Sequence, residues 1–535
     1  MMKKTHNTLL ICAIVVLLTI TLTACSGDGN PDQSPNLAQN QDSSTSDSTP
    51  LQQSPQIDDD DYENDIYDNE EIIESTPDVI RETILVSDES QLRSAVNLAA
   101  HPTTVTLTAD IELISDFVIP TGADILMEST DGNMFSLIAT RDMAAITVQQ
   151  DATLTIENIG VTRIYGTSGI GVSISGYFVM NGGTISNHTD GGVHNRDGAY
   201  FLMNEGKISD NTANRFSSGG GGILNHSIFV MNGGTISNNT AYRNTMGGGG
   251  VLVHGSSARN PASFTMHGGI ISNNTAISPG SGTKGGGVSI RYGYFSLYDG
   301  IISDNTADSR GGGIHSEVAR LYIHGGMISG NTATRGGGIS SESEFTMSGG
   351  TIHENIATAL GGGVHFSRNF TMYAGSITNN IANENGGGVH IAPFSGDSVF
   401  VMHNGSIDNN LADNGGGVFI SSGRHSTGVL ELNGGILYNN IVHSNGGGVY
   451  NQGGSFRMTN GIITNNNANS AGGGLRHSSG WSTIDGGWIF DNLASDDMDI
   501  SIANQGVFNN NVFDPYIGAI GNAPPAGVAI TPTNP

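Results

Sequence analysis

The chain has 535 residues, of which 78 are Gly, yet 36% of its residues are hydrophobic, which excludes a disordered Gly-rich polymer. Its formal net charge is -29, and Lys and Arg together number only 20. Because phosphate groups are bound by clustered cations, this charge balance excludes nucleic acid as an expected partner.

The first residues have the features of a bacterial lipoprotein signal. A short basic start, MMKK, precedes an apolar run that ends at Leu22-Thr23-Ala24-Cys25. This junction resembles the lipobox, in which the Cys is lipidated and becomes the mature N-terminus. We expect residues 1–24 to be a lipoprotein signal peptide and lipid on Cys25 to attach the protein to the membrane. The alternative is an uncleaved apolar anchor. Cys12 is the only other Cys, so a disulfide framework and a Cys-based metal site are excluded.

Residues 25–82 predict a disordered acidic linker. They are rich in Ser, Asp, Gln and Pro and contain little apolar surface to bury. Calcium capture by Asp58–Asp61 is an alternative, although the residue spacing of a preformed calcium loop is missing.

Residues 83–177 predict an N-terminal cap and the first coils of a solenoid. Ser87 or Asp88 is placed to cap a short helix, with Leu92, Val96 and Leu98 near one face. Short alternating runs such as TVTLT and TLTIEN then predict strands. A short helix before such strands is expected to cover the open end of a stacked sheet.

A repeat of about 28 residues begins at Phe178 and reads F-x-M-x-G-G-x-I-S-x-N-T-A, a variable stretch, then G-G-G-V. Residues alternate inward and outward within three short runs of each unit, and no unit contains a helical pattern long enough for a helical repeat. The chain is therefore predicted to be all-β, with a parallel β-helix over residues 178–510 and a C-terminal tail over residues 511–535. The repeats start at Phe178, Phe201, Phe229, Phe264, Phe295, Leu321, Phe345, Phe370, Phe400, Leu430, Phe456 and Ser482.

One Asn recurs three residues after the Ile of each unit. In consecutive coils these amides are expected to lie about 4.8 Å apart and to form a hydrogen-bonded ladder that satisfies the turn backbone. The predicted ladder consists of Asn211, Asn239, Asn274, Asn305, Asn331, Asn355, Asn380, Asn410, Asn440, Asn466 and Asn492, and His188 takes the first position.

Two further features of the unit are interpreted as architecture. The residue before each ladder Asn varies among Asn, Asp, Gly and Glu, so we expect it to be a permissive position. The glycines are expected to provide positive φ and close approach between coils.

Within residues 178–475 the repeat resembles that of the polymorphic outer-membrane protein family, with Gly where that family usually has Ala. The resemblance implies a right-handed parallel β-helix displayed at a bacterial surface, commonly in adhesion. We therefore expect a cell-envelope protein exposed at the surface and anchored by lipid on Cys25.

Many parallel β-helices degrade acidic polysaccharides, and this chemistry needs converging carboxylates or a Lys or Arg base. Carboxylates such as Asp304 and Asp491 stand where other units have Asn or Gly, which argues against a general acid. The best acidic cluster, Asp496, Asp497 and Asp499, is more typical of a solvated loop.

Histidines concentrate in the repeat. Alternation predicts outward side chains for His267, His324 and His403, and also for His315, His365 and His390. His365 and His390 occupy equal positions in neighbouring coils, so they are expected either to form a surface stack or to share a metal; no third ligand is visible. We therefore predict no metal site and no cofactor.

The expected function is a non-catalytic surface scaffold or adhesin. Its predicted ligand is a glycan or protein, from the host or the envelope, that lies along the outward residues after the inward Met: Asn232, His267, Tyr298, His324, Ser348, Tyr373 and His403. The alternative is a β-helix polysaccharide lyase or glycoside hydrolase.

Overall fold

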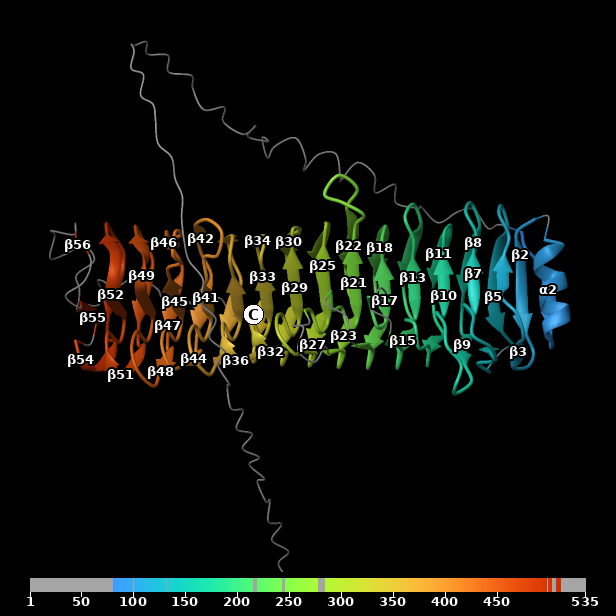
Figure 1. Ribbon diagram of the computed structural model, residues 1–535, viewed down its shortest axis with the longest axis horizontal. Helices are drawn as coiled ribbons and strands as arrows, with labels where there is room; N and C mark the ends of the chain where they lie inside the picture. Colours follow the sequence, from blue (N-terminus) through green and yellow to red (C-terminus); the bar gives the residue numbers. More distant parts are fainter. Residues whose placement is uncertain are drawn as a thin grey trace, which may run out of the picture. The chain divides into compact units, whose positions relative to one another are not determined.

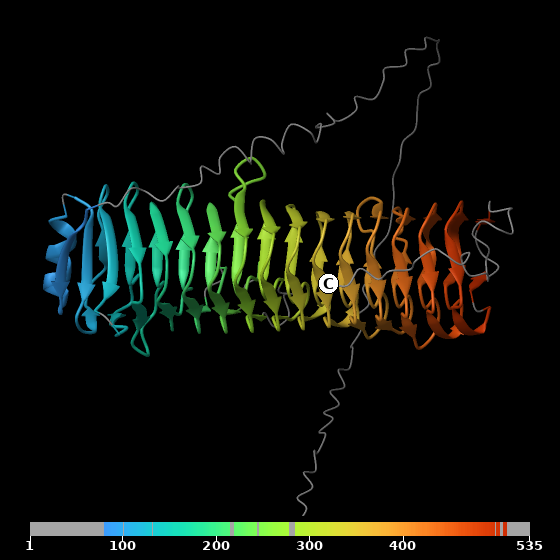
Figure 2. The same ribbon diagram turned by 180° about the vertical axis from the view of Figure 1, so that it is seen from behind.

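The computed structural model describes residues 80–99, 101–130, 132–214, 219–242, 246–277, 284–497, 499–502 and 507–510. These residues form a parallel β-solenoid in which successive coils stack in chain order, as the colours from blue to red show in Figures 1 and 2. The signal peptide, Cys25, the acidic linker up to residue 79 and the C-terminal tail lie outside the described residues.

Each full coil contains four short strands. One coil consists of β34 (Glu344–Met347), β35 (Thr351–His353), β36 (Ile356–Leu360) and β37 (Val364–Phe366). Strands equivalent to β34 and β37 form a 30-stranded sheet, those equivalent to β35 a 15-stranded sheet, and those equivalent to β36 an 11-stranded sheet. The 15-stranded sheet takes one strand from each coil. The sequence predicts three strands per unit; the additional strand was missed because runs as short as β40 (Ile381–Ala382) carry no readable alternation.

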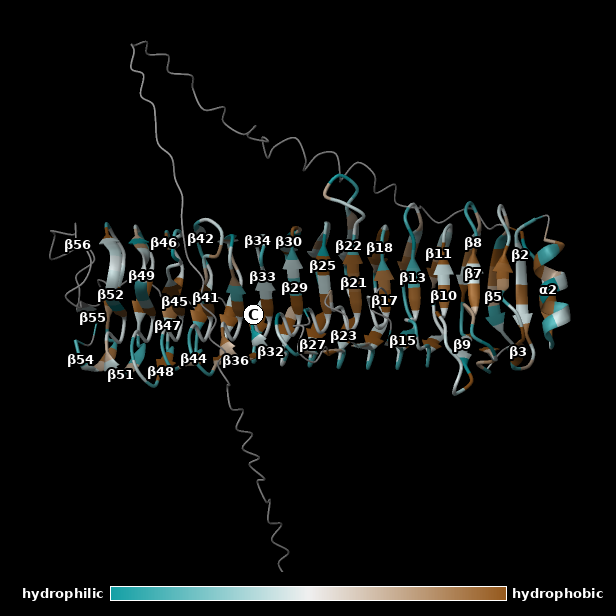
Figure 3. Cartoon of the chain, viewed as in Figure 1, coloured by the Kyte–Doolittle hydropathy of each residue, from teal (hydrophilic) through white to brown (hydrophobic). Residues whose placement is uncertain are grey.

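Strands of successive coils pair in parallel and in register, so identical side chains stack inside. Phe345 lies opposite Phe370, and Met347 lies opposite Met372 in β38 (Asn369–Met372). The stacked rings of Phe345 and Phe370 are 4.3 Å apart between centroids, and those of Phe370 and Phe400 are 4.4 Å apart. These rings are at most 2% exposed. Figure 3 shows the hydrophobic residues gathered in the strands and the hydrophilic ones in the connections.

A helix covers the N-terminal end of the solenoid, as predicted. Strand β1 (Glu82–Val86) leads into α2 (Glu89–Asn97), whose N-cap Asp88 accepts a hydrogen bond from the Gln91 amide. Leu92, Ala95 and Val96 are buried against the first coils. The prediction for Leu98 is wrong: it is 79% exposed, because it is the C-cap residue beyond the last helical turn. Within the described part of the chain, no helix is long and apolar enough to cross a membrane.

The recurring Asn residues form one continuous hydrogen-bonded column through the interior. Asn380 is typical: its Nδ2 donates to Asn410 Oδ1 (3.0 Å) and to the Ile352 carbonyl (2.9 Å), and its backbone N–H also donates to Asn410 Oδ1. Its own Oδ1 accepts from the backbone N–H and the Nδ2 of Asn355. All eleven predicted members are at most 2% exposed and occupy this column: Asn211, Asn239, Asn274, Asn305, Asn331, Asn355, Asn380, Asn410, Asn440, Asn466 and Asn492.

The two ends of this Asn ladder carry charges of opposite sign. Every Oδ1 points toward the preceding coil, so the amide dipoles align with their negative end toward the N-terminus. At the C-terminal end, Asp499 Oδ1 accepts from the N–H and Nδ2 of Asn492, both at 3.0 Å. At the N-terminal end, His188 N–H donates to Asn211 Oδ1, and the Arg163 guanidinium donates to His188 Nδ1. Asp499 is thus an end group of the ladder, a role that the sequence analysis missed when it placed this residue in a solvated loop.

The position before each ladder Asn is not permissive. Its φ is positive in every repeat, for example 55° at Asn379, 54° at Glu354 and 64° at Gly330. Only Gly, Asn and Asp adopt this left-handed region readily, which explains most of the residues found there. The variation among Asn, Asp, Gly and Glu thus reflects a backbone requirement, and the sequence prediction is corrected here.

The Gly triplet has three separate causes, illustrated by Gly361, Gly362 and Gly363. Gly361 has a φ of +66°. A Cβ on Gly362 would lie 2.5 Å from the carbonyl oxygen of Gly387 in the next coil, and a Cβ on Gly363 would lie 3.0 Å from Asn380 Nδ2. The triplet therefore allows the backbone to approach both the next coil and the Asn ladder.

Candidate functional site

An exposed column of polar and aromatic side chains runs along one corner of the solenoid. Each member directly follows the inward Met, Leu or Ile that ends a strand, such as β30 (Arg320–Ile323), β34 or β38, so the alternation of the strand turns it outward. His267, Ser348, Tyr373 and His403 are exposed, and Tyr298 and His324 are half-buried. We call this the exposed column, and its members are Asn232, His267, Tyr298, His324, Ser348, Tyr373 and His403.

The rings of the exposed column stack on one another. The centroids of His267 and Tyr298 are 5.0 Å apart, those of Tyr298 and His324 are 4.5 Å apart, and those of Tyr373 and His403 are 5.0 Å apart. Such stacking fixes the ring orientations before any ligand binds, and each pair adds about 1 kcal/mol beyond its burial.

Amide side chains extend this column toward the N-terminus. Asn232 Nδ2 donates to Asn204 Oδ1, and Asn204 Nδ2 donates to Asn181 Oδ1, both at 2.8 Å. Asn181 in turn donates to Glu157. Sequence analysis left Asn204 out of the predicted surface, although it follows the inward Met203 as Asn232 follows Met231.

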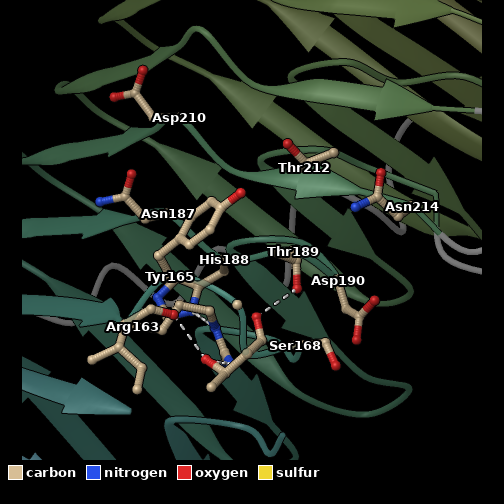
Figure 4. Close-up of a pocket in the computed structure, with 13 residues that line it drawn as sticks. Arg163, Tyr165, Ser168, Asn187, His188, Thr189, Asp190, Asp210, Thr212 and Asn214 are labelled. Atoms are coloured by element: carbon tan, nitrogen blue, oxygen red, sulfur yellow. Dashed lines mark hydrogen bonds between the residues drawn. The ribbon is translucent and has the colours of Figure 1, made fainter. Parts of the chain in front are cut away.

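A hollow of about 690 Å³ lies at the N-terminal end of the Asn ladder (Figure 4). The segment Ile164–Ser168, between β9 (Gly160–Arg163) and the next coil, forms one wall, and Tyr165 on it is fully exposed. Asn187, Asp190 and Asp210 line the opposite side. The 11-stranded sheet begins only at β16 (Thr212–Ala213), so the preceding coils have a loop at this place.

The floor of the hollow is an Arg–His pair whose hydrogen-bonding groups are engaged. Arg163 is 6% exposed and donates to His188 Nδ1 (3.2 Å) and to the Met143 carbonyl (2.8 Å). His188 Nε2 donates to the Val161 carbonyl. Burial and the neighbouring Arg163 lower the pKa of His188 to about 3, so its imidazole is neutral near pH 7. This pair terminates the Asn ladder and is poorly suited to proton transfer.

The outward exposure predicted for His315, His365 and His390 is wrong. They point away from the core but are only 1%, 7% and 5% exposed, because the Gly triplet curls back over this face: a Cβ on Gly361 would lie 2.8 Å from the Cβ of His365. His365 and His390 stack at 5.2 Å. Burial, together with Arg335, lowers the pKa of His390 to about 3. Among the described residues, no group of three or more His, Cys, Asp or Glu side chains is arranged to hold a metal ion.

Three cations that sequence analysis did not single out lie beside these buried imidazoles. Lys284, Arg310 and Arg335 directly precede the Gly triplets of three consecutive coils and pair in parallel through isolated bridges. Lys284 forms an ion pair with Glu317 (2.6 Å), and Arg310 forms one with Glu342. Burial and the positive charges of Lys284 and Arg310 lower the pKa of His315. The cations thus favour the neutral form of these buried imidazoles.

The three members of the acidic cluster near the last coil have different environments. Asp499 is engaged by Asn492, whereas Asp496 and Asp497 are exposed at the end of β54 (Leu493–Asp496). The hollow and the exposed column are the two candidate binding surfaces, and Cys25, the predicted lipidation residue, lies outside the described residues.

Comparisons with protein-family models, with curated proteins and with solved structures found no match to this chain. The resemblance to the polymorphic outer-membrane protein repeat therefore has no support from a family match. What stands independently of it is the architecture: an all-β parallel solenoid with 15 strands in its single-strand-per-coil sheet.

Proposed function

We propose that this chain is a lipid-anchored protein of the bacterial cell surface whose solenoid binds a glycan or protein through the exposed column and does not catalyse a reaction. The anchor is lipid on Cys25, and the acidic residues up to 82 form the spacer between the membrane and the solenoid. The sequence features at the N-terminus and the parallel β-solenoid support this proposal.

The observation that carries the proposal is the continuity of the exposed column. Seven successive coils present Asn, His, Tyr or Ser at the same corner, and neighbouring rings are stacked 4.5–5.0 Å apart. An extended ligand meets a new polar or aromatic group at every coil, about 4.8 Å apart. Rigid aromatic anchors between polar groups are typical of binding surfaces, because little side-chain entropy is lost on binding.

The arrangement of titratable groups favours binding over catalysis. The imidazole that lines the hollow is that of His188, and both of its ring nitrogens form hydrogen bonds. Its lowered pKa makes it a weak base. His267 and His403 stand in a row of stacked rings. The alternative, a lyase or hydrolase, requires a carboxylate or cation to converge on bound substrate.

The test is a binding and turnover assay on the full chain in detergent with acidic and neutral polysaccharides. We expect the wild type to bind without producing new reducing ends or unsaturated products. The Tyr373→Ala variant is expected to bind the polysaccharide at least tenfold more weakly. Tyr177→Ala is the matched control, because Tyr177 is 51% exposed and Tyr373 is 53% exposed, but Tyr177 lies outside the exposed column. Equal loss in both variants would contradict the assignment of the surface. Turnover abolished by a carboxylate substitution would establish the enzyme instead.

Surface display is tested separately. Protease added to intact cells is expected to remove the solenoid from the cells while a cytoplasmic marker remains intact. Complete protection of the solenoid would contradict surface exposure.

A further inference from the structure

The rings of the exposed column are interrupted at one coil. His267, Tyr298 and His324 form one stack, Tyr373 and His403 form the next, and Ser348 stands between them. Ile323 pairs with Met347, and Met347 pairs with Met372, so the residues that follow them, His324, Ser348 and Tyr373, occupy the same place in three consecutive coils. The two stacks are thus separated by one missing ring.

The interruption affects the side chain and not the backbone. The backbone amides of His324, Ser348 and Tyr373 each donate to a carbonyl of the preceding coil at 2.8 Å. The backbone hydrogen bonding between coils therefore continues through Ser348 without a bulge. Figure 1 shows β30 and β34 as regular neighbours in the row of coils. A Ser at this position therefore leaves the corner in place and removes only the ring.

The space between the two stacks matches the thickness of one ring. Two coil spacings place the rings of His324 and Tyr373 about 9.6 Å apart, which is about twice the 4.8 Å spacing of neighbouring coils. A single ring between them lies one stacking distance from each neighbour, as Tyr298 does between His267 and His324. Tyr373 is 53% exposed and Ser348 is exposed, so a ligand can approach from solvent.

The groups around this position are hydroxyls, the His324 imidazole and the Tyr322 ring, whose centroid lies 6.1 Å from that of His324. Ser348 Oγ lies 3.1 Å from His324 Nδ1. On the same outward side, Thr346 and Thr371 lie opposite each other in β34 and β38. Hydroxyls donate and accept, and therefore suit a ring whose rim carries hydroxyl groups and whose two faces are apolar. This combination describes a pyranose better than a purely apolar aromatic ring, which has no rim hydroxyls for these side chains to bind.

We propose that a pyranose ring of a bound glycan occupies the position above Ser348, between the rings of His324 and Tyr373. The proposal rests on the proposed function, because it assigns the ligand class of the exposed column. His324 and Tyr373 hold the two faces of the sugar, and the Ser348 hydroxyl contacts its rim.

The test fills the gap with a side chain that the column already uses. Ser348→Tyr in the full chain is expected to fold normally and to weaken the affinity for chitohexaose, cellohexaose or maltohexaose at least tenfold, measured by calorimetry. Ser348→Ala, which keeps the gap open, is expected to lose no more than about threefold. Ser395→Tyr is the matched control, because Ser395 is also an exposed Ser but lies outside the exposed column, and this variant is expected to bind like the wild type.

The outcomes separate the two proposals. If Ser348→Tyr binds these hexasaccharides as well as the wild type while Tyr373→Ala does not, the pyranose site is wrong and the exposed column remains the binding surface. If the wild type binds none of the three hexasaccharides, the pyranose assignment is overturned, and the column is then judged by the polysaccharide and protein assays alone. Melting curves of all variants, expected to coincide with the wild type within 2 °C, show that loss of binding is not loss of fold.

Discussion

Replacing Asn380 by Ala removes one rung from the middle of the Asn ladder. The Asn355 backbone N–H and one Asn355 Nδ2 hydrogen lose their acceptor, and the Ile352 carbonyl, which is also part of the parallel strand pairing, loses one donor. The two Asn355 donors are buried, and an unsatisfied buried group costs roughly 1–3 kcal/mol, so the two together predict a loss of at least about 2 kcal/mol in local stability. A cavity left by the shortened side chain adds to this cost.

Hydrogen exchange measures this loss locally, which matters because a long solenoid need not unfold in a single two-state transition. The peptide that contains the amide of Asn355 is expected to exchange at least about thirtyfold faster in Asn380→Ala, because each 1.4 kcal/mol corresponds to a factor of ten. Asn379→Gly is the matched control: φ is 55° at Asn379 and Gly330 stands at the equivalent position, so its exchange is expected to change less than threefold. Similar exchange rates in the two variants would refute the energetic role of the ladder.

Three further predictions concern acid, the Gly triplet and the anchor. The pKa of His390 is about 3 in the folded protein and 6.5 ordinarily, so its contribution to stability is complete above pH 6.5 and is lost as the pH falls toward 3; the loss is about 2 kcal/mol at pH 5. His390→Gln should therefore flatten the dependence of the melting temperature on pH between 7 and 5. An unchanged slope would contradict the lowered pKa of this imidazole. Gly363→Ala should destabilise the solenoid by at least about 2 kcal/mol in chemical denaturation, because its Cβ would meet the carbonyl of Gly388 at 2.7 Å, whereas a wild-type midpoint would mean that the coils separate easily. Cys25→Ser should release the protein from the membrane fraction, and retention of the variant through detergent partitioning would contradict lipidation.

The repeat made much of the architecture readable from the sequence. The inward Phe and Met, the Ile and the ladder Asn recur at fixed spacing. Parallel in-register coils place each of them against the equivalent residue of the next coil. Phe345 on Phe370 and Asn355 on Asn380 follow from this single rule. The exposed column follows from the same alternation, since each of its residues comes directly after an inward side chain.

What the sequence did not reveal depends on contacts between parts of the coil that are distant in the repeat. Alternation correctly turns His365 away from the core, but it carries no information that the backbone at Gly361 folds back over that face. The groups at the two ends of the Asn ladder likewise occur only once each in the repeat array. Arg163 and Asp499 lie outside the periodic pattern, and only the three-dimensional arrangement brings them to His188 and Asn492.

The position before the ladder Asn illustrates a different limit. Its residue types vary, which favoured the interpretation of a permissive site, whereas the property they share is tolerance of a positive φ. Glu354 occupies the same conformation at a cost that nothing in its surroundings explains.

The most direct test of the exposed column as the binding surface is hydrogen exchange of the full chain with and without a saturating glycan that it binds. Slower exchange is expected in peptides that contain Ser348 and Tyr373, at the corners after β34 and β38, with no change at Tyr165 and Asp190 beside the hollow. Protection confined to the hollow, or spread over the solenoid without preference for these corners, would contradict the assignment.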